Sequence, residues 1–175
     1  MRKGLAFFSM VFFVLLSCGD NQAAVNENNS ESVNQEIKIT QRAIEKFDYM
    51  DYVLSVNGEK AVMDWEKYQE LVIQINYLKK ADLSFFNGDK KLLGKFIDSF
   101  KVQIPDTLKT NSIVSRTVIV ETSLLRLNEN LTLENIDGGL KLEGVKEVLV
   151  AFSNLNYQIN KKLERDIYEQ IKSEY

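Results

Sequence analysis

Three pairs of carboxylates are the residues of this chain whose type and spacing could do chemistry. The members of each pair lie three or four residues apart: Asp48 and Asp51, Glu66 and Glu70, Glu143 and Glu147. On a helix this spacing puts both acids on one face, and two such carboxylates can act as general acid and base when burial raises one pKa. Most helical acid pairs are simply solvated, and Glu66 and Glu143 lie off the apolar faces of their segments. We therefore assign no catalytic residue.

The amino-acid composition and the missing motifs exclude most other kinds of catalytic or metal-binding site. The chain contains no histidine, which excludes the commonest general base, the commonest metal ligand and every Ser-His or Cys-His nucleophile arrangement. Phosphate-binding and dinucleotide-binding glycine motifs are also missing. The nearest approach to a calcium loop would place Leu133 and Gly144 at its first and twelfth positions, where neither side chain can bind a cation. The sequence predicts no metal, no cofactor and a turn around Asp137.

Three polar residues interrupt apolar helix faces: Asp51, Glu121 and Asn156. Buried polar groups must be hydrogen-bonded and buried charges paired, so these residues need partners, and Arg116 and Arg126 are the candidates. Two interpretations stay open: a structural polar network, which we favour, or a polar pocket between helices for a small ligand. If Glu121 belongs to a buried pair, removing it should cost about 3–5 kcal/mol.

Cys18 is the only cysteine and ends the sequence Leu15-Leu16-Ser17-Cys18. A charged start and an apolar run from Leu5 to Leu16 precede it. The run suits the apolar stretch of about 7–15 residues in a secretory signal and falls short of the roughly 20 residues of a spanning helix. An ordinary signal peptide cut elsewhere and a short membrane anchor are the alternatives.

The arrangement around Cys18 resembles the signal peptide and lipobox of bacterial lipoproteins. The resemblance implies that a diacylglyceryl group is attached to the Cys18 sulfur, that residues 1–17 are removed, and that the new amino group is acylated. Two or more acyl chains anchor a protein stably in a membrane. Residues 110–116 and 152–160 are also similar to small, uncharacterised helical lipoproteins of Gram-negative bacteria, which implies no activity.

The sequence divides into three parts: a signal peptide (1–17), a lipidated Cys18 with a tether (18–36), and one domain (37–175). The tether is predicted to be disordered, because residues 19–36 include five asparagines and no aromatic side chain. Removal of the signal peptide takes away Arg2 and Lys3, which leaves 20 basic and 25 acidic residues, a net charge of −5. This acidic balance without a basic run argues against nucleic-acid binding.

Apolar residues recur at helical spacing in five stretches of the domain. They predict an all-α fold, an antiparallel bundle of four to five helices over residues 40–172, with Asp89 as a helix cap and a last helix of roughly 45 Å. Breaks are expected at residues 57–58, 87–88, 105–106 and 137–139. The five stretches are Ile44, Phe47, Met50 and Leu54; Val62, Trp65, Tyr68, Val72 and Ile75; Leu93, Phe96, Ile97 and Phe100; Ile113, Thr117, Val120, Leu124, Leu127 and Leu131; and Val145, Leu149, Phe152, Ile159, Leu163 and Ile171.

Two segments carry strand signals that compete with this interpretation. Asn57-Gly58 between apolar runs is a strong hairpin signal, so residues 52–63 have a β-hairpin as their alternative. Residues 131–142 alternate with period two across a Gly-Gly turn, and a short β-ribbon is the alternative there. Residues 114–120 are also rich in β-branched side chains, which lowers their helix propensity.

Together these features predict an envelope lipoprotein that acts as a non-catalytic binding or structural module. Its expected partners are the lipid bilayer, through acylated Cys18, and an envelope protein or small ligand. Asp20 would be the third residue of the mature chain, so retention in the inner membrane by an Asp directly after the cysteine is not indicated, and the outer membrane is the expected location. The alternatives are a surface-exposed adhesin or host-factor binder, and a carboxylate-dependent hydrolase, which the missing histidine disfavours.

Overall fold

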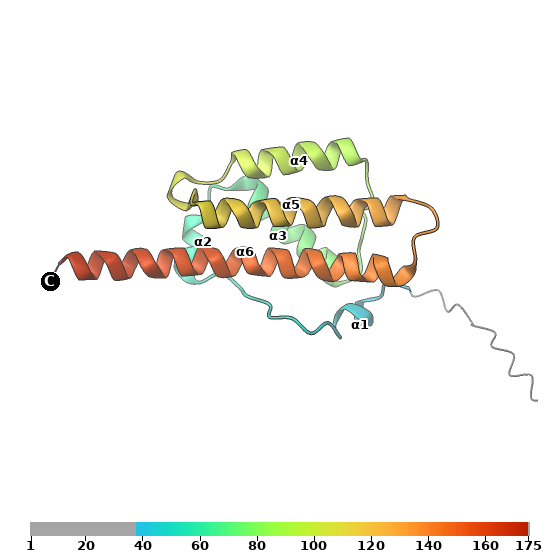
Figure 1. Cartoon of the computed structure of the whole chain (residues 1–175), viewed down its shortest axis with the longest axis horizontal. Helices are drawn as coiled ribbons and strands as arrows, with labels where there is room; N and C mark the ends of the chain where they lie inside the picture. The colour runs from blue at the N-terminus through green and yellow to red at the C-terminus, as the bar shows by residue number, and fades with distance from the viewer. Residues whose placement is uncertain (1–37, 175) are drawn as a thin grey trace, which may run out of the picture. The chain divides into compact units, whose positions relative to one another are not determined.

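The computed structural model describes residues 38–174 (Figure 1). They form six α-helices and one short 3-10 turn, with no strand among them. The predicted all-α class is therefore confirmed. In chain order the elements are α1 (Gln41–Ile44), α2 (Val56–Ala61), α3 (Glu66–Lys79), α4 (Lys90–Val102), the 3-10 turn η1 (Asp106–Leu108), α5 (Asn111–Thr132) and α6 (Gly138–Ser173).

The two longest helices, α5 and α6, pack against each other along most of the length of α5. They run in opposite directions and are joined by the turn of residues 133–137 (Figure 1). α6 contains 36 residues. At 1.5 Å per residue it is roughly 54 Å long, so the last helix is the longest, as predicted, and exceeds the roughly 45 Å expected.

Aspartate side chains begin α4 and α6. Asp89 accepts a hydrogen bond from the backbone N–H of Lys91 at 2.6 Å, and Asp137 accepts one from Gly139 at 2.7 Å. Such caps satisfy backbone donors that have no partner within the first helical turn. The predicted cap at Asp89 and the turn around Asp137 are thus both confirmed.

A cluster of aromatic rings joins α3, α4 and α6. Trp65 is fully buried, stacks on Phe100 with 4.8 Å between ring centroids, and donates from Nε1 to the Phe100 carbonyl at 2.8 Å. Tyr68 lies 5.2 Å from Trp65 and 5.5 Å from Phe152 of α6 by the same measure. This cluster fixes the face of α3 on which the site described below is built.

The predicted first helix is wrong. Ile44, Phe47, Met50 and Leu54 have helical spacing, but only Gln41–Ile44 is helical, and residues 45–55 contain no helix. We call residues 50–55 the strap, because this open stretch of chain is held along α6. Its backbone groups bond to side chains of α6 instead of to one another, which satisfies them without a helix.

Neither alternative ribbon forms within the described residues. Asn57-Gly58 lies inside α2, because Ser55 caps that helix by accepting a hydrogen bond from the Gly58 N–H at 3.1 Å. The break expected at residues 57–58 is therefore wrong as well, and Val62 and Trp65 precede α3 instead of beginning it.

Residues 131–142 contain the end of α5, a turn and the start of α6. The other three expected breaks fall between helices or at the start of α6.

Candidate functional site

One face of α6 carries three polar side chains that hold the strap: Ser153, Asn156 and Asn160. Their spacing of three and then four residues puts them on one side of the helix. Ser153 accepts a hydrogen bond from the Tyr52 N–H at 2.7 Å and donates its own proton to the Met50 carbonyl. A side chain that both accepts and donates in this way fixes the start of the strap on α6.

Asn160 fixes the other end of the strap. Its Nδ2 donates to the Val53 carbonyl at 2.8 Å, and its Oδ1 accepts from the Ser55 N–H at 2.9 Å. α2 approaches this amide so closely that a Cβ atom on Gly58 would lie 2.9 Å from Asn160 Oδ1. Close packing against Asn160 and Leu54 therefore favours a glycine at position 58, which lies within a helix and not in a turn.

Asn156 lies between these two residues and is only 7% exposed. Its Nδ2 donates to the Tyr52 carbonyl at 2.9 Å, and its Oδ1 accepts from the Tyr68 hydroxyl at 2.7 Å. Burial, and to a lesser degree the negative charge of Glu59, raises the pKa of Tyr68 well above its ordinary value. The hydroxyl therefore keeps its proton and remains the donor to Asn156.

The strap, α2, α3 and α6 surround a cleft of about 560 Å³. Pockets of roughly 300–1,000 Å³ that combine apolar lining with a few polar groups are typical of small-molecule sites. The apolar lining consists of Leu54, Val62, Val72, Ile75 and Phe152, and the rim combines the exposed apolar Val53 and Met63 with the polar Asp51, Glu59, Gln69, Asn76 and Lys79. The cleft thus has an apolar floor and a polar mouth.

Asp51 lies at the mouth of this cleft and not in the interior. Its carboxylate is 2.6 Å from the Lys79 ammonium group, and the two side chains are 48% and 34% exposed. Asp51 has the partner that the sequence called for and lines the cleft, but it is not buried, because the segment that carries it is the strap and not a helix packed on the core. Exposed ion pairs of this kind contribute about 0–1 kcal/mol.

Glu121 and Arg116 of α5 lie outside the cleft lining. Glu121 pairs with Lys101 of α4, its two carboxylate oxygens 2.8 and 3.0 Å from Nζ, and is 24% exposed. Its partner is thus a lysine of a neighbouring helix and not an arginine of its own. Arg126 pairs with Glu147 at 2.8 Å, and Arg116 is half-buried with no carboxylate of the described chain within 4.0 Å. The structure therefore brings Asp51 and Asn156 to one cleft and leaves Glu121 and Arg116 elsewhere.

The members of the three carboxylate pairs are exposed or ion-paired in the described chain. Asp48 and Asp51 lie on a non-helical segment. Glu70 forms an ion pair with Lys67, and Glu147 forms the one with Arg126 described above. Among residues 38–174 no group of three or more acidic, histidine or cysteine side chains is arranged to hold a metal ion.

Ser153 and Asn160 were not singled out from the sequence as site residues. A signal was present, because Ser153, Asn156 and Asn160 form a polar row within the apolar face of α6. What the sequence lacked was the partner, since these side chains bond to backbone atoms about one hundred residues away.

No protein-family model, curated protein or solved structure matches this chain. Cys18, the predicted signal peptide and the tether lie outside the described residues. In the part of the chain that the structure describes, no helix has the length and apolar character needed to cross a bilayer.

Proposed function

We propose that this protein is a lipid-anchored, non-catalytic binding module of the bacterial cell envelope, located in the outer membrane, and that the cleft beneath the strap is its ligand site. The observation that carries the proposal is the cleft itself, with an apolar floor and a polar mouth built from four separate elements. The lipobox-like sequence around Cys18 supports the anchor, and the lack of histidine in the chain supports a role without catalysis.

The chemistry of the cleft favours a small amphipathic ligand. Tyr68 and Asn156 already bond to each other on the cleft wall, so the polar groups left for a ligand are those of the rim. The rim carries two acids, Asp51 and Glu59, and one base, Lys79, which is paired with Asp51. An apolar body would rest on the floor while a neutral or cationic group meets the mouth, since a polyanion would face net negative charge.

We infer that α3, α4, α5 and α6 form an antiparallel four-helix bundle that keeps this cleft open. The five-residue connection between α5 and α6 and the opposite directions of these two helices support this arrangement. Within it, the strap is hydrogen-bonded to α6 and α2 packs on α6, so the cleft walls belong to one packed unit.

Filling the cleft should weaken ligand binding selectively. Val72 lines the cleft, and the next residue, Ile73, is 52% exposed and lies outside the lining. We expect Val72→Trp to weaken binding of the neutral apolar dye Nile red by the full-length protein about tenfold or more, which corresponds to about 1.4 kcal/mol. Ile73→Trp is the matched control and should bind like the parent. Fluorescence titration measures both affinities.

Equal dye affinities for Val72→Trp and Ile73→Trp would contradict the assignment of the cleft as the binding site. Thermal unfolding of both variants accompanies the titration, because a variant that no longer folds loses binding for an unrelated reason. If Val72→Trp proves unfolded, Asn76→Trp at the exposed rim is the replacement, with the same expected loss of dye binding.

The anchor makes a separate prediction. Mass spectrometry of the N-terminus of the protein purified from membranes should show Cys18 as the first residue, carrying acyl chains on its sulfur and its amino group. Replacing Cys18 with alanine removes the sulfur that would carry the diacylglyceryl group, so the acylated N-terminal peptide should disappear and residues 1–17, with the apolar run from Leu5 to Leu16, should stay attached. Recovery of residues 1–17 on the mature protein, or an unmodified Cys18, would refute the anchor without bearing on the cleft.

A further inference from the structure

The mouth of the cleft has two ends that differ in charge. At one end the carboxylate of Asp51 lies 2.6 Å from the ammonium group of Lys79, so their charges offset each other. Gln69 lies on the same helix as Lys79 but ten residues earlier, which is roughly 15 Å at 1.5 Å per residue. Because Asp51 holds the ammonium group of Lys79 at its own end, no positive charge of the cleft lining is available at the Gln69 end.

Glu59 of α2 brings a negative charge to the Gln69 end. It lies one helical turn before Val62, whose carbonyl accepts a hydrogen bond from Gln69 Nε2 at 2.8 Å. Its charge is also felt at Tyr68 on the cleft wall, where burial, and to a lesser degree Glu59, raises the pKa of the hydroxyl. Glu59 is exposed and forms no ion pair with any residue of the described chain. Its charge at the mouth is therefore not compensated.

The polar groups at this end are mainly hydrogen-bond acceptors. An ionised carboxylate such as that of Glu59 only accepts. Gln69 uses its Nε2 to hold the Val62 carbonyl, and its Oε1 accepts no hydrogen bond from residues 38–174. The Tyr68 hydroxyl donates its single proton to Asn156. A ligand group that fits this end must supply both N–H donors and a positive charge, and a primary ammonium group has three such donors and no acceptor.

We propose that the cleft binds an amphipathic primary amine, whose ammonium group is held by the Glu59 carboxylate and Gln69 Oε1 while its apolar body rests on the cleft floor. This inference rests on the ligand site proposed above and names the class of its ligand. A quaternary ammonium group carries the same charge but has no N–H, so it cannot make the charge-assisted hydrogen bonds. An alcohol of the same length lacks the charge, and a carboxylate has the wrong sign.

Displacement of Nile red from the full-length protein by three octyl ligands tests this assignment. Octylamine, 1-octanol and octyltrimethylammonium share one apolar chain and differ in the head group, and octylamine is protonated at pH 7, as a lysine side chain is. We expect octylamine to displace the dye at about fivefold lower concentration than 1-octanol, which corresponds to an ion pair of about 1 kcal/mol. Octyltrimethylammonium should lie between the two.

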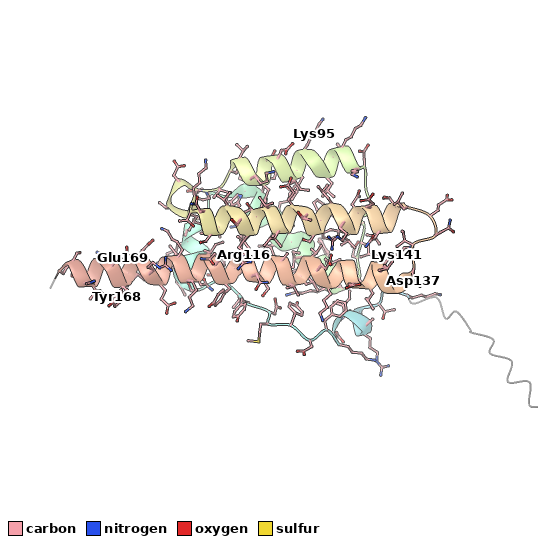
Figure 2. The ribbon with its side chains drawn as sticks, in the orientation of Figure 1. Lys95, Arg116, Asp137, Lys141, Tyr168 and Glu169 are labelled. Atoms are coloured by element: carbon pink, nitrogen blue, oxygen red, sulfur yellow. The ribbon has the colours of Figure 1, made fainter. Side chains whose placement is uncertain are left out.

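Glu59→Gln should abolish the preference for octylamine over 1-octanol and leave the affinity for the neutral dye unchanged. Glu169→Gln is the matched control, because it removes one negative charge from the projecting end of α6 (Figure 2). Glu169 lies nine residues beyond Asn160, the residue of α6 that Gly58 of α2 approaches. This separation is roughly 13 Å along the helix and exceeds the Debye length of about 8 Å at physiological salt, so the control should keep the preference.

Loss of the preference in Glu59→Gln but not in Glu169→Gln supports the amine site. A preference that both variants retain, or that both lose, would overturn it, since the cation would then not be bound by Glu59. Octyltrimethylammonium as effective as octylamine would overturn the restriction to primary amines. Failure of the ligand site itself is seen separately, when Val72→Trp binds Nile red like Ile73→Trp. Glu59 and Glu169 are both exposed, and unchanged thermal unfolding confirms that each variant folds.

Discussion

Replacing Asn156 with leucine should lower the free energy of unfolding by about 2–4 kcal/mol. The substitution introduces an apolar side chain of similar size and removes the partner of two polar groups, the Tyr52 carbonyl and the Tyr68 hydroxyl. Each buried polar group left without a partner costs about 1–3 kcal/mol. In a domain of this size the loss corresponds to a fall in melting temperature of roughly 5–15 °C, which thermal or urea unfolding would measure.

Glu121→Gln is the control for Asn156→Leu. Both residues interrupt apolar helix faces, but Glu121 is partly exposed and its pair with Lys101 is reached by solvent. Ion pairs of this kind contribute at most about 1 kcal/mol, so the melting temperature should change little. This expectation replaces the larger loss that a fully buried pair would have given.

An Asn156→Leu variant as stable as the parent, or more stable, would contradict the structural role of Asn156. Functional sites often hold polar groups at a cost in stability, and such a result would assign this amide to ligand binding in the cleft. If Asn156→Leu is less stable but still binds Nile red when folded, Asn156 supports the fold and does not take part in dye binding.

Replacing Trp65 with alanine should cost about 3–5 kcal/mol, the range found when a large buried aromatic side chain is truncated. Trp65 is fully buried, stacks on Phe100 and donates to its carbonyl oxygen. Its loss removes the ring that joins the start of α3 to α4 and leaves a cavity beside Tyr68. Urea unfolding should show a much lower midpoint, or no cooperative transition.

Two further variants separate the contributions of Trp65. Trp65→Phe retains an aromatic ring for the stack and loses the indole donor, so it should cost about 1–3 kcal/mol through the unpaired Phe100 carbonyl and imperfect packing. Tyr168→Ala removes a side chain that is 67% exposed and should change the free energy of unfolding by no more than about 0.5 kcal/mol. Equal effects of Trp65→Ala and Tyr168→Ala would show that this aromatic cluster does not hold the fold.

The strap links the stability of the fold to the shape of the cleft. Met50, Tyr52, Val53 and Ser55 are all bonded to α6 through their backbones. Because these bonds involve backbone atoms of the strap, they do not themselves depend on the identity of the strap side chains. The α6 side chains are not interchangeable in the same way, since each supplies a specific donor or acceptor.

The sequence by itself determined the helices whose signals are local. The apolar spacing over α4, α5 and α6 and the caps at Asp89 and Asp137 depend on residues within one or two turns of each other, so the start of α4 and the turn before α6 could be predicted. α5 shows that intrinsic helix propensity does not decide the structure by itself, because its β-branched residues have low helix propensity and are nevertheless helical. Packing against α6 outweighs their weak intrinsic preference.

Only the tertiary structure decided the fate of residues 45–55 and of the polar residues. Ile44, Phe47, Met50 and Leu54 have helical spacing, but the chain is held open by hydrogen bonds to side chains about one hundred residues away. Likewise, Asn156 could be predicted to need a partner, but its partners come from the strap and α3. Glu121 pairs with a lysine of α4 for the same reason. Which side chains of two helices meet depends on how the helices are placed against each other. The apolar spacing within one helix does not identify the residue of the neighbouring helix that a polar side chain will contact.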